Sequence, residues 1–145
     1  MRAFVGILIV VMLSGCDPMG PLPGGALTGE VTTSPDNWAL LAEIETVQLE
    51  TNPDDPYSVN LWVVSVESRL YIAAGGGETK WSTHFSTDPN VRLRIERNIY
   101  ELRASPVDNH QELEEVRLAY VDKYAMKSDS PQFDDSRVFR LDSRL

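Results

Sequence analysis

A run of three glycines, followed closely by a hydroxyl and a basic side chain, is the part of this sequence most suited to binding an anion. Gly75, Gly76 and Gly77 precede Thr79 and Lys80. Successive glycines allow backbone N–H groups to converge on a phosphate, and the threonine hydroxyl and lysine ammonium could add a hydrogen bond and a charge. The alternative is that the glycines form only a flexible connection between a strand and a short helix.

Other polar and aromatic side chains stand where they could face a ligand. Glu50 and Asn60 adjoin apolar residues near the ends of two predicted strands, so they could bind the polar edge of a small molecule, or simply close a strand end. Tyr71, Trp62 and Trp81 could stack on a ring system, or belong to the core of a small barrel. The sequence leaves both alternatives open, and it identifies no catalytic residue.

Several kinds of chemistry are excluded or unsupported. Cys16 is the one cysteine, so a disulfide, a CxxC redox pair and a cysteine zinc site are excluded, as is a catalytic thiolate if that cysteine is lipidated. His84 and His110 are far apart in the sequence and lack a nearby carboxylate pattern, so no metal site is predicted. The hydrolase motifs GxSxG and HExxH do not occur.

The N-terminus has the pattern of an export signal. Arg2 precedes an apolar run at 3–13 that is too short to span a bilayer, which needs about 20 residues. The following Leu-Ser-Gly-Cys, ending at Cys16, resembles the bacterial lipobox. This predicts a lipoprotein signal peptide at 1–15, a lipidated Cys16 and a cell-envelope protein tethered to a membrane. Asp17 weakly favours retention on the periplasmic side of the inner membrane. The alternatives are an ordinary signal peptide with a chance cysteine, or an uncleaved anchor.

The remaining chain has the size of one domain. Residues 16–33 are rich in glycine and proline, which predicts a flexible tether, and 34–145 would form the folded domain. The net charge of −9 becomes −10 once Arg2 (+1) leaves with the signal peptide. Such an acidic chain offers no basic surface for nucleic acid, and none is expected as a partner.

Periodicity predicts an α+β domain made mainly of antiparallel strands. Alternating or β-branched patterns favour strands, and the spacing of Asn109 and Glu112 predicts a capped helix. The expected strands are 44–51, 57–66, 69–74, 91–96, 99–107 and 138–141, with a short helix at 79–86 and a long one at 109–127.

The order of these elements resembles the FMN-binding split-barrel superfamily, the pyridoxamine-5′-phosphate-oxidase-like and deazaflavin-dependent nitroreductase-like proteins. The resemblance covers about 44–141 and is carried by element order, by Lys80-Trp81 and by the Asp-Pro-Asn-Val stretch at 88–91. It implies a split β-barrel of about six antiparallel strands with one long C-terminal and one short helix. It also implies a cofactor phosphate near 71–80. The candidate cofactor-binding residues are Asn60, Tyr71, Gly75, Gly76, Gly77, Thr79 and Lys80.

The resemblance also implies a second basic residue near the phosphate, and homodimers with the cofactor at the seam. Arg69, Arg92 and Arg94 are the candidates, although Arg92 and Arg94 share a strand face with Glu96 that could simply be solvated. We therefore expect a membrane-anchored lipoprotein that binds FMN, a related flavin or another small molecule. The alternative is a non-catalytic binding or scaffold lipoprotein that has lost the cofactor site. This alternative is supported by export, because an exported chain crosses the membrane unfolded and would have to acquire any flavin outside the cytoplasm.

Overall fold

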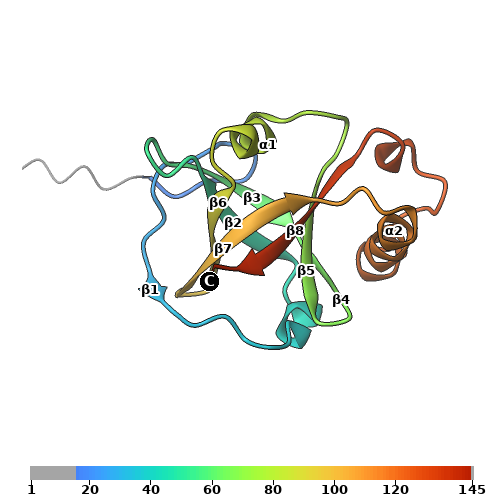
Figure 1. The fold of residues 1–145 in the computed structure, drawn as a ribbon, viewed down its shortest axis with the longest axis horizontal. Helices are drawn as coiled ribbons and strands as arrows, with labels where there is room; N and C mark the ends of the chain where they lie inside the picture. The colour runs from blue at the N-terminus through green and yellow to red at the C-terminus, as the bar shows by residue number, and fades with distance from the viewer. Residues whose placement is uncertain (1–15, 145) are drawn as a thin grey trace, which may run out of the picture.

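The computed structural model describes residues 16–144, so the predicted signal peptide lies outside the described residues. A curled antiparallel sheet forms the body of the molecule, with one long helix packed on its outside (Figure 1). Among residues 16–144, no helix is long and apolar enough to cross a membrane. The strands are β1 (Glu30–Val31), β2 (Thr46–Thr51), β3 (Tyr57–Trp62), β4 (Val64–Val66), β5 (Arg69–Ala74), β6 (Asn90–Ile95), β7 (Asn98–Pro106) and β8 (Arg137–Ser143). The helices are α1 (Lys80–Thr83) and α2 (His110–Tyr124), with 3-10 turns η1 (Ala39–Glu43), η2 (His84–Ser86) and η3 (Pro131–Phe133).

The strands follow the order β3-β2-β6-β7-β8-β5-β4, and β1 adds a short parallel pair with β7. The two ends of this path are consecutive in the chain, because only Val63 separates β3 from β4. The predicted strand 57–66 is therefore two strands: β3 pairs with β2, and β4 pairs with β5. This change of partner curls the sheet into a barrel, and the predicted α+β split barrel is confirmed.

The barrel interior is filled by the apolar residues that alternate along the strands. Leu49 on β2, Leu93 on β6 and Leu102 on β7 are fully buried. Each such burial contributes roughly 1.5–3 kcal/mol. The same interior cluster includes Leu70, Ile72, Ala74, Phe139 and Leu141 from β5 and β8. The period-two patterns of β2, β6 and β7 thus predicted which side of these three strands faces inward.

Helix α2 begins as its sequence predicts. The Asn109 side chain accepts a hydrogen bond from the backbone N–H of Glu112 at 2.9 Å, which satisfies one of the free donors of the first turn. Val116 and Tyr120 bury the helix against the outer face of β4 and β5. Trp62, one of the aromatic residues considered for the barrel core, is instead 45% exposed and stacks on Tyr124 with ring centroids 4.3 Å apart.

Lys123 of α2 is half-buried and points toward the barrel. Its Nζ donates hydrogen bonds of 2.7 Å to the carbonyls of Leu41, Ile44 and Val63. These carbonyls lie at η1, just after it, and at the break between β3 and β4, where regular strand pairing is interrupted. Lysine supplies three donors on a long stem, so one side chain can satisfy all three.

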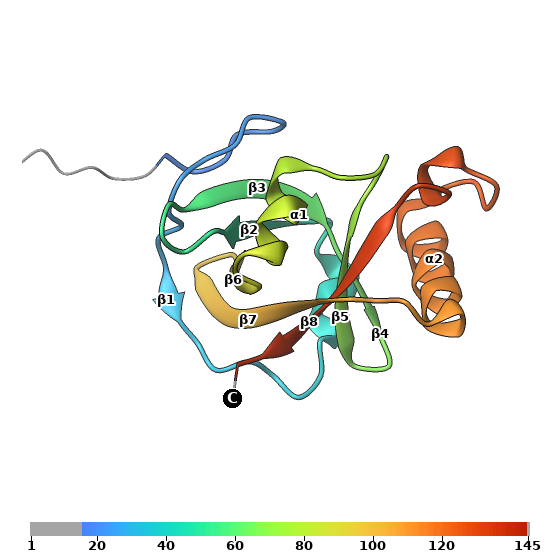
Figure 2. The same ribbon diagram turned by 45° about the horizontal axis from the view of Figure 1, so that its top comes forward.

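Residues 16–33, expected to form a flexible tether, make hydrogen bonds with the barrel along much of their length. Gly24 exchanges backbone hydrogen bonds with Ser58 of β3 at 2.8 and 2.9 Å. Leu27 is 2% exposed, and Glu30 and Val31 pair with the start of β7. Figure 2 shows this blue segment following the side of the molecule formed by β3 and β7. The structure therefore extends ordered contacts upstream of the domain boundary expected at residue 34.

Candidate functional site

The triple glycine forms an exposed turn between β5 and α1. Gly76 and Gly77 have positive φ angles of 74° and 95°, a backbone conformation that glycine adopts without strain. A Cβ placed on any of the three would meet no atom within 4 Å, so the turn borders open space. Gly76 and Gly77 are therefore required here for backbone conformation, and the turn leaves room for a ligand beside it.

The residues after the turn are already engaged with one another. Thr79 caps α1: its side-chain oxygen accepts from the N–H of Ser82, and the Ser82 oxygen accepts from the N–H of Thr79. Lys80 lies over the ring of Tyr57, with Nζ 4.6 Å from the ring centroid. Lys80 is exposed, so its ammonium remains accessible to an anion beside the turn.

A cleft of about 350 Å³ lies next to this turn. Its apolar side is formed by Phe85 and Phe139, whose ring centroids are 4.8 Å apart in an edge-to-face arrangement. Arg137 stands at the cleft, where its guanidinium pairs with Glu78 at 2.6 Å. The cleft is lined by Glu78, Ser82, Thr83, Phe85, Ser86, Pro106, Arg137 and Phe139. Its volume falls at the small end of ordinary ligand sites, and its lining suits a flat ring with an anionic or polar group.

Asn60 and Tyr71, predicted to share a site with the turn, are committed to other contacts. Asn60 donates hydrogen bonds to the carbonyls of Pro18 (3.3 Å) and Gly20 (3.1 Å), so it holds the N-terminal segment. Tyr71 is 2% exposed and faces α2, where its hydroxyl donates to Glu112 at 2.7 Å. The structure thus keeps Gly75, Gly76, Gly77, Thr79 and Lys80 together and assigns Asn60 and Tyr71 to separate packing contacts.

Tyr71, Glu112 and Arg140 form a linked polar group under α2. Glu112 accepts from the tyrosine hydroxyl and from Arg140 at 2.8–3.0 Å. The Tyr71 hydroxyl first, and then Arg140, lower the pKa of Glu112 by stabilising its carboxylate, against an opposing effect of burial. Burial, followed by the hydrogen bond to Glu112, raises the pKa of Tyr71. The group joins β5, β8 and α2, and the sequence did not predict it.

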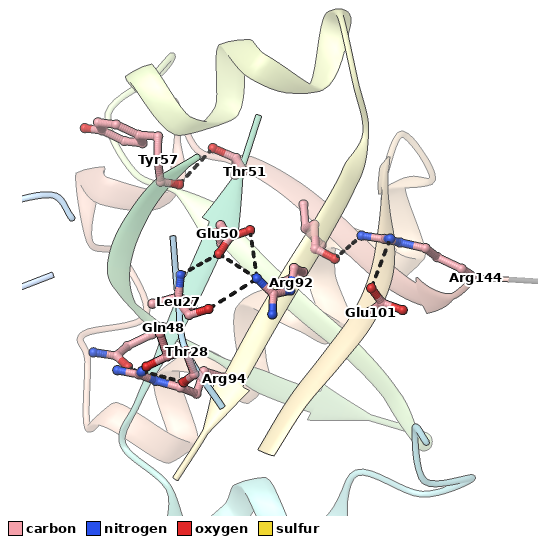
Figure 3. A network of polar contacts seen from close by, with 11 residues as sticks. Leu27, Thr28, Gln48, Glu50, Thr51, Tyr57, Arg92, Arg94, Glu101 and Arg144 are labelled. Carbon is pink, nitrogen blue, oxygen red and sulfur yellow. Dashed lines mark hydrogen bonds and ion pairs between the residues drawn. The ribbon is translucent and has the colours of Figure 1, made fainter. Parts of the chain in front are cut away.

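Glu50, Arg92 and Arg94 form a second polar network on β2 and β6, shown in Figure 3. Glu50 is 4% exposed; its carboxylate accepts from the N–H of Leu27 at 2.6 Å and pairs with Arg92 at 3.1 Å. Arg94 contacts Gln48, the Thr28 carbonyl and the carboxylate of Asp17. The two arginines therefore bind the N-terminal segment, so the expected solvated face is covered and their charges are matched by carboxylates.

A larger cavity of about 510 Å³ adjoins Lys123. Burial lowers the pKa of this lysine, whereas its three carbonyl partners favour the charged form. Because the ammonium already donates to three carbonyls, it has no donor left for a ligand. Within residues 16–144, no group of three His, Cys, Asp or Glu side chains is placed to hold a metal ion.

No protein-family model matches this sequence, and no curated protein is similar to it. Solved structures share its fold. An FAD-binding protein from Mesorhizobium loti aligns with a TM-score of 0.54 and 15% identity over 72% of this chain and 85% of its own. HutZ, the heme storage protein of Vibrio cholerae, aligns with a TM-score of 0.51 and 15% sequence identity, over 71% of this chain and 84% of HutZ. A NimC/NimA family protein from Clostridium acetobutylicum aligns with a TM-score of 0.52 and 19% sequence identity, over 70% of this chain and 76% of its own. This chain thus shares the split-barrel fold of these proteins.

Proposed function

We propose that this protein is a lipid-anchored lipoprotein of the cell envelope whose split barrel binds a flat, anionic small molecule of the flavin type. The observation that carries the binding proposal is the cleft beside the triple-glycine turn. The half-buried Phe85 supplies an apolar wall for a ring, backed by Phe139, which is 2% exposed, and Arg137 supplies a cation at its edge. The lipobox-like sequence ending at Cys16 supports the anchor.

Flavin is the ligand class that best combines these requirements. Its ring system matches an aromatic wall, and its phosphate matches the guanidinium of Arg137 at the cleft. The structural neighbours include an FAD-binding protein and a heme storage protein, which both hold large flat cofactors. The proposal concerns binding of the ligand by the residues that line this cleft.

A second candidate is a scaffold lipoprotein that binds no cofactor. It is favoured by the pairing of Arg92 with Glu50, Arg94 with Asp17 and Arg140 with Glu112, because these cations are already neutralised within the chain. The pairing of Arg137 with Glu78 would also have to loosen before a phosphate could bind strongly.

The two candidates are separated by purifying the protein from membranes and recording its visible absorbance and the quenching of added FMN. The binding proposal predicts either a chromophore that is already bound or FMN fluorescence quenching that saturates at one FMN per protein. A colourless protein that leaves FMN fluorescence unchanged at all concentrations would favour the scaffold. Light scattering on the same samples tests the homodimer that the family resemblance predicts.

A further inference from the structure

The described structure begins with a small hairpin, residues 16–25, that is closed by backbone hydrogen bonds. Met19 and Leu22 exchange N–H to carbonyl hydrogen bonds of 3.0 and 2.9 Å, with Gly20 and Pro21 at the turn. The N–H of Gly25 donates to the carbonyl of Cys16 at 2.9 Å. Figure 2 shows this blue hairpin projecting beyond β3. The hairpin therefore has a defined conformation from Cys16 onward.

The hairpin is seated on the barrel through several independent contacts. Asn60 donates to two of its carbonyls, and Asp17 pairs with Arg94 at 2.9 Å. Gly24 allows a close approach within the hairpin, because a Cβ there would lie 2.3 Å from the Cys16 oxygen and 2.5 Å from the nitrogen of Pro18. These contacts fix the direction in which the hairpin points relative to the sheet.

The tip of the hairpin presents apolar side chains to solvent, and no unpaired charged residue of the hairpin lies beside them. Met19 is 71% exposed and Leu22 is 65% exposed. Asp17 is the one charged residue of 16–25, and its carboxylate is paired with Arg94. Met19 follows Cys16 by three residues, so even a fully extended chain would separate them by only about 10 Å.

We infer that hairpin 16–25 contacts the lipid bilayer, with Met19 and Leu22 entering the boundary between headgroups and acyl chains. This inference rests on the proposed lipid anchor, because acyl chains on Cys16 would bring the bilayer to the hairpin tip. Apolar side chains beside a lipidated residue add buried area to the anchor. Since the hairpin is seated on β3 and β6, its insertion holds the barrel in one orientation. Both ribbon views place α2 on the side of the barrel away from the hairpin.

The test uses the full acylated protein, extracted from membranes and reconstituted into vesicles of neutral phosphatidylcholine. An environment-sensitive dye is attached to Leu22→Cys or, as the matched control, to Asp129→Cys, an exposed site in the loop after α2. The dye at 22 should emit at shorter wavelength and be quenched by spin-labelled lipid, and the dye at 129 should do neither. Identical water-like emission at both sites, in protein whose mass shows the acyl chains, would overturn the inference and leave the anchor intact.

Orientation is tested by energy transfer from the dye at residue 129 to an acceptor on the vesicle surface. Gly24→Ala should unseat the hairpin and raise this transfer, because the barrel would tilt freely. Gly75→Ala, at a glycine with open space around it, should leave the transfer unchanged. Equal transfer in wild type and Gly24→Ala would overturn the fixed orientation. An unmodified mass at Cys16 would instead refute the anchor, and the inference with it.

Discussion

Glu50 and Arg92 stand directly opposite each other on β2 and β6, and together they hold the backbone of Leu27 against the barrel. The Glu50 carboxylate accepts from the N–H of Leu27, and Arg92 donates to its carbonyl at 3.2 Å. One partly buried ion pair thus bonds to the backbone of the N-terminal segment at a point where that segment has no strand partner. This arrangement links the barrel to the chain that follows the proposed anchor.

Glu50→Gln should lower the free energy of unfolding by roughly 1–3 kcal/mol, because a buried, charge-assisted set of hydrogen bonds loses its acceptor charge. Urea denaturation followed by tryptophan fluorescence measures the change. Glu101→Gln is the control: Glu101 is exposed and lies 3.7 Å from Arg144, so its loss should cost less than about 1 kcal/mol. Equal effects of the two substitutions would show that the Glu50 network does not stabilise the fold.

Lys123→Met should also destabilise the protein, by about 1–3 kcal/mol, because three carbonyls lose their common donor while the length of the side chain is kept. The matched control is Lys127→Met, an exposed position just beyond α2, which should change stability by no more than about 0.5 kcal/mol. Thermal unfolding of the two variants decides the matter. A Lys123→Met protein as stable as wild type would mean that these carbonyls are satisfied without the lysine.

Glu112 should make the free energy of unfolding decrease as the pH falls into the acid range. Its pKa is lowered from the ordinary value of 4.5 by Tyr71 and Arg140, so below pH 4.5 the unfolded state binds the proton more readily than the folded state. The contribution of Glu112 is therefore present above pH 4.5 and is lost as the pH falls through the lowered pKa. Between pH 6 and pH 3, wild type should lose more stability than Glu112→Gln. Parallel pH profiles for the two proteins would contradict this assignment.

The sequence predicted the parts of the fold that depend on local patterns. Leu93 and Leu102 lie on strands in which apolar and polar residues alternate, so the inward face of each could be predicted from spacing alone. Asn109 caps α2 as its position in the sequence indicates. The break at Val63 could not be read in this way, because residues on both sides of it are apolar and the change of strand partner is set by closure of the barrel.

The candidate site was predicted only in part, and the reason lies in long-range contacts. The turn and Lys80 follow from local composition, and the structure places a cleft beside Glu78, the residue directly after the turn. Asn60 instead binds Pro18 and Gly20, which precede it by about forty residues, and Tyr71 binds Glu112 on a later helix. Arg137 and Phe139 were missed because β8 reaches the cleft only through its pairing with β5 and β7, which are distant in the sequence.

The cleft's ligand is tested most directly by equilibrium titration of the purified protein with FMN. The test compares one substitution that should weaken FMN binding with one that should strengthen it. Arg137→Gln should weaken binding about tenfold, equivalent to ~1.4 kcal/mol, because the phosphate loses a cation. Glu78→Gln should strengthen binding, because it frees that guanidinium from its carboxylate partner. Arg103→Gln, at an exposed residue of β7, should leave the Kd unchanged. Saturable binding with this pattern is the predicted result; no saturable binding, or one affinity shared by all four proteins, would contradict a flavin site in this cleft.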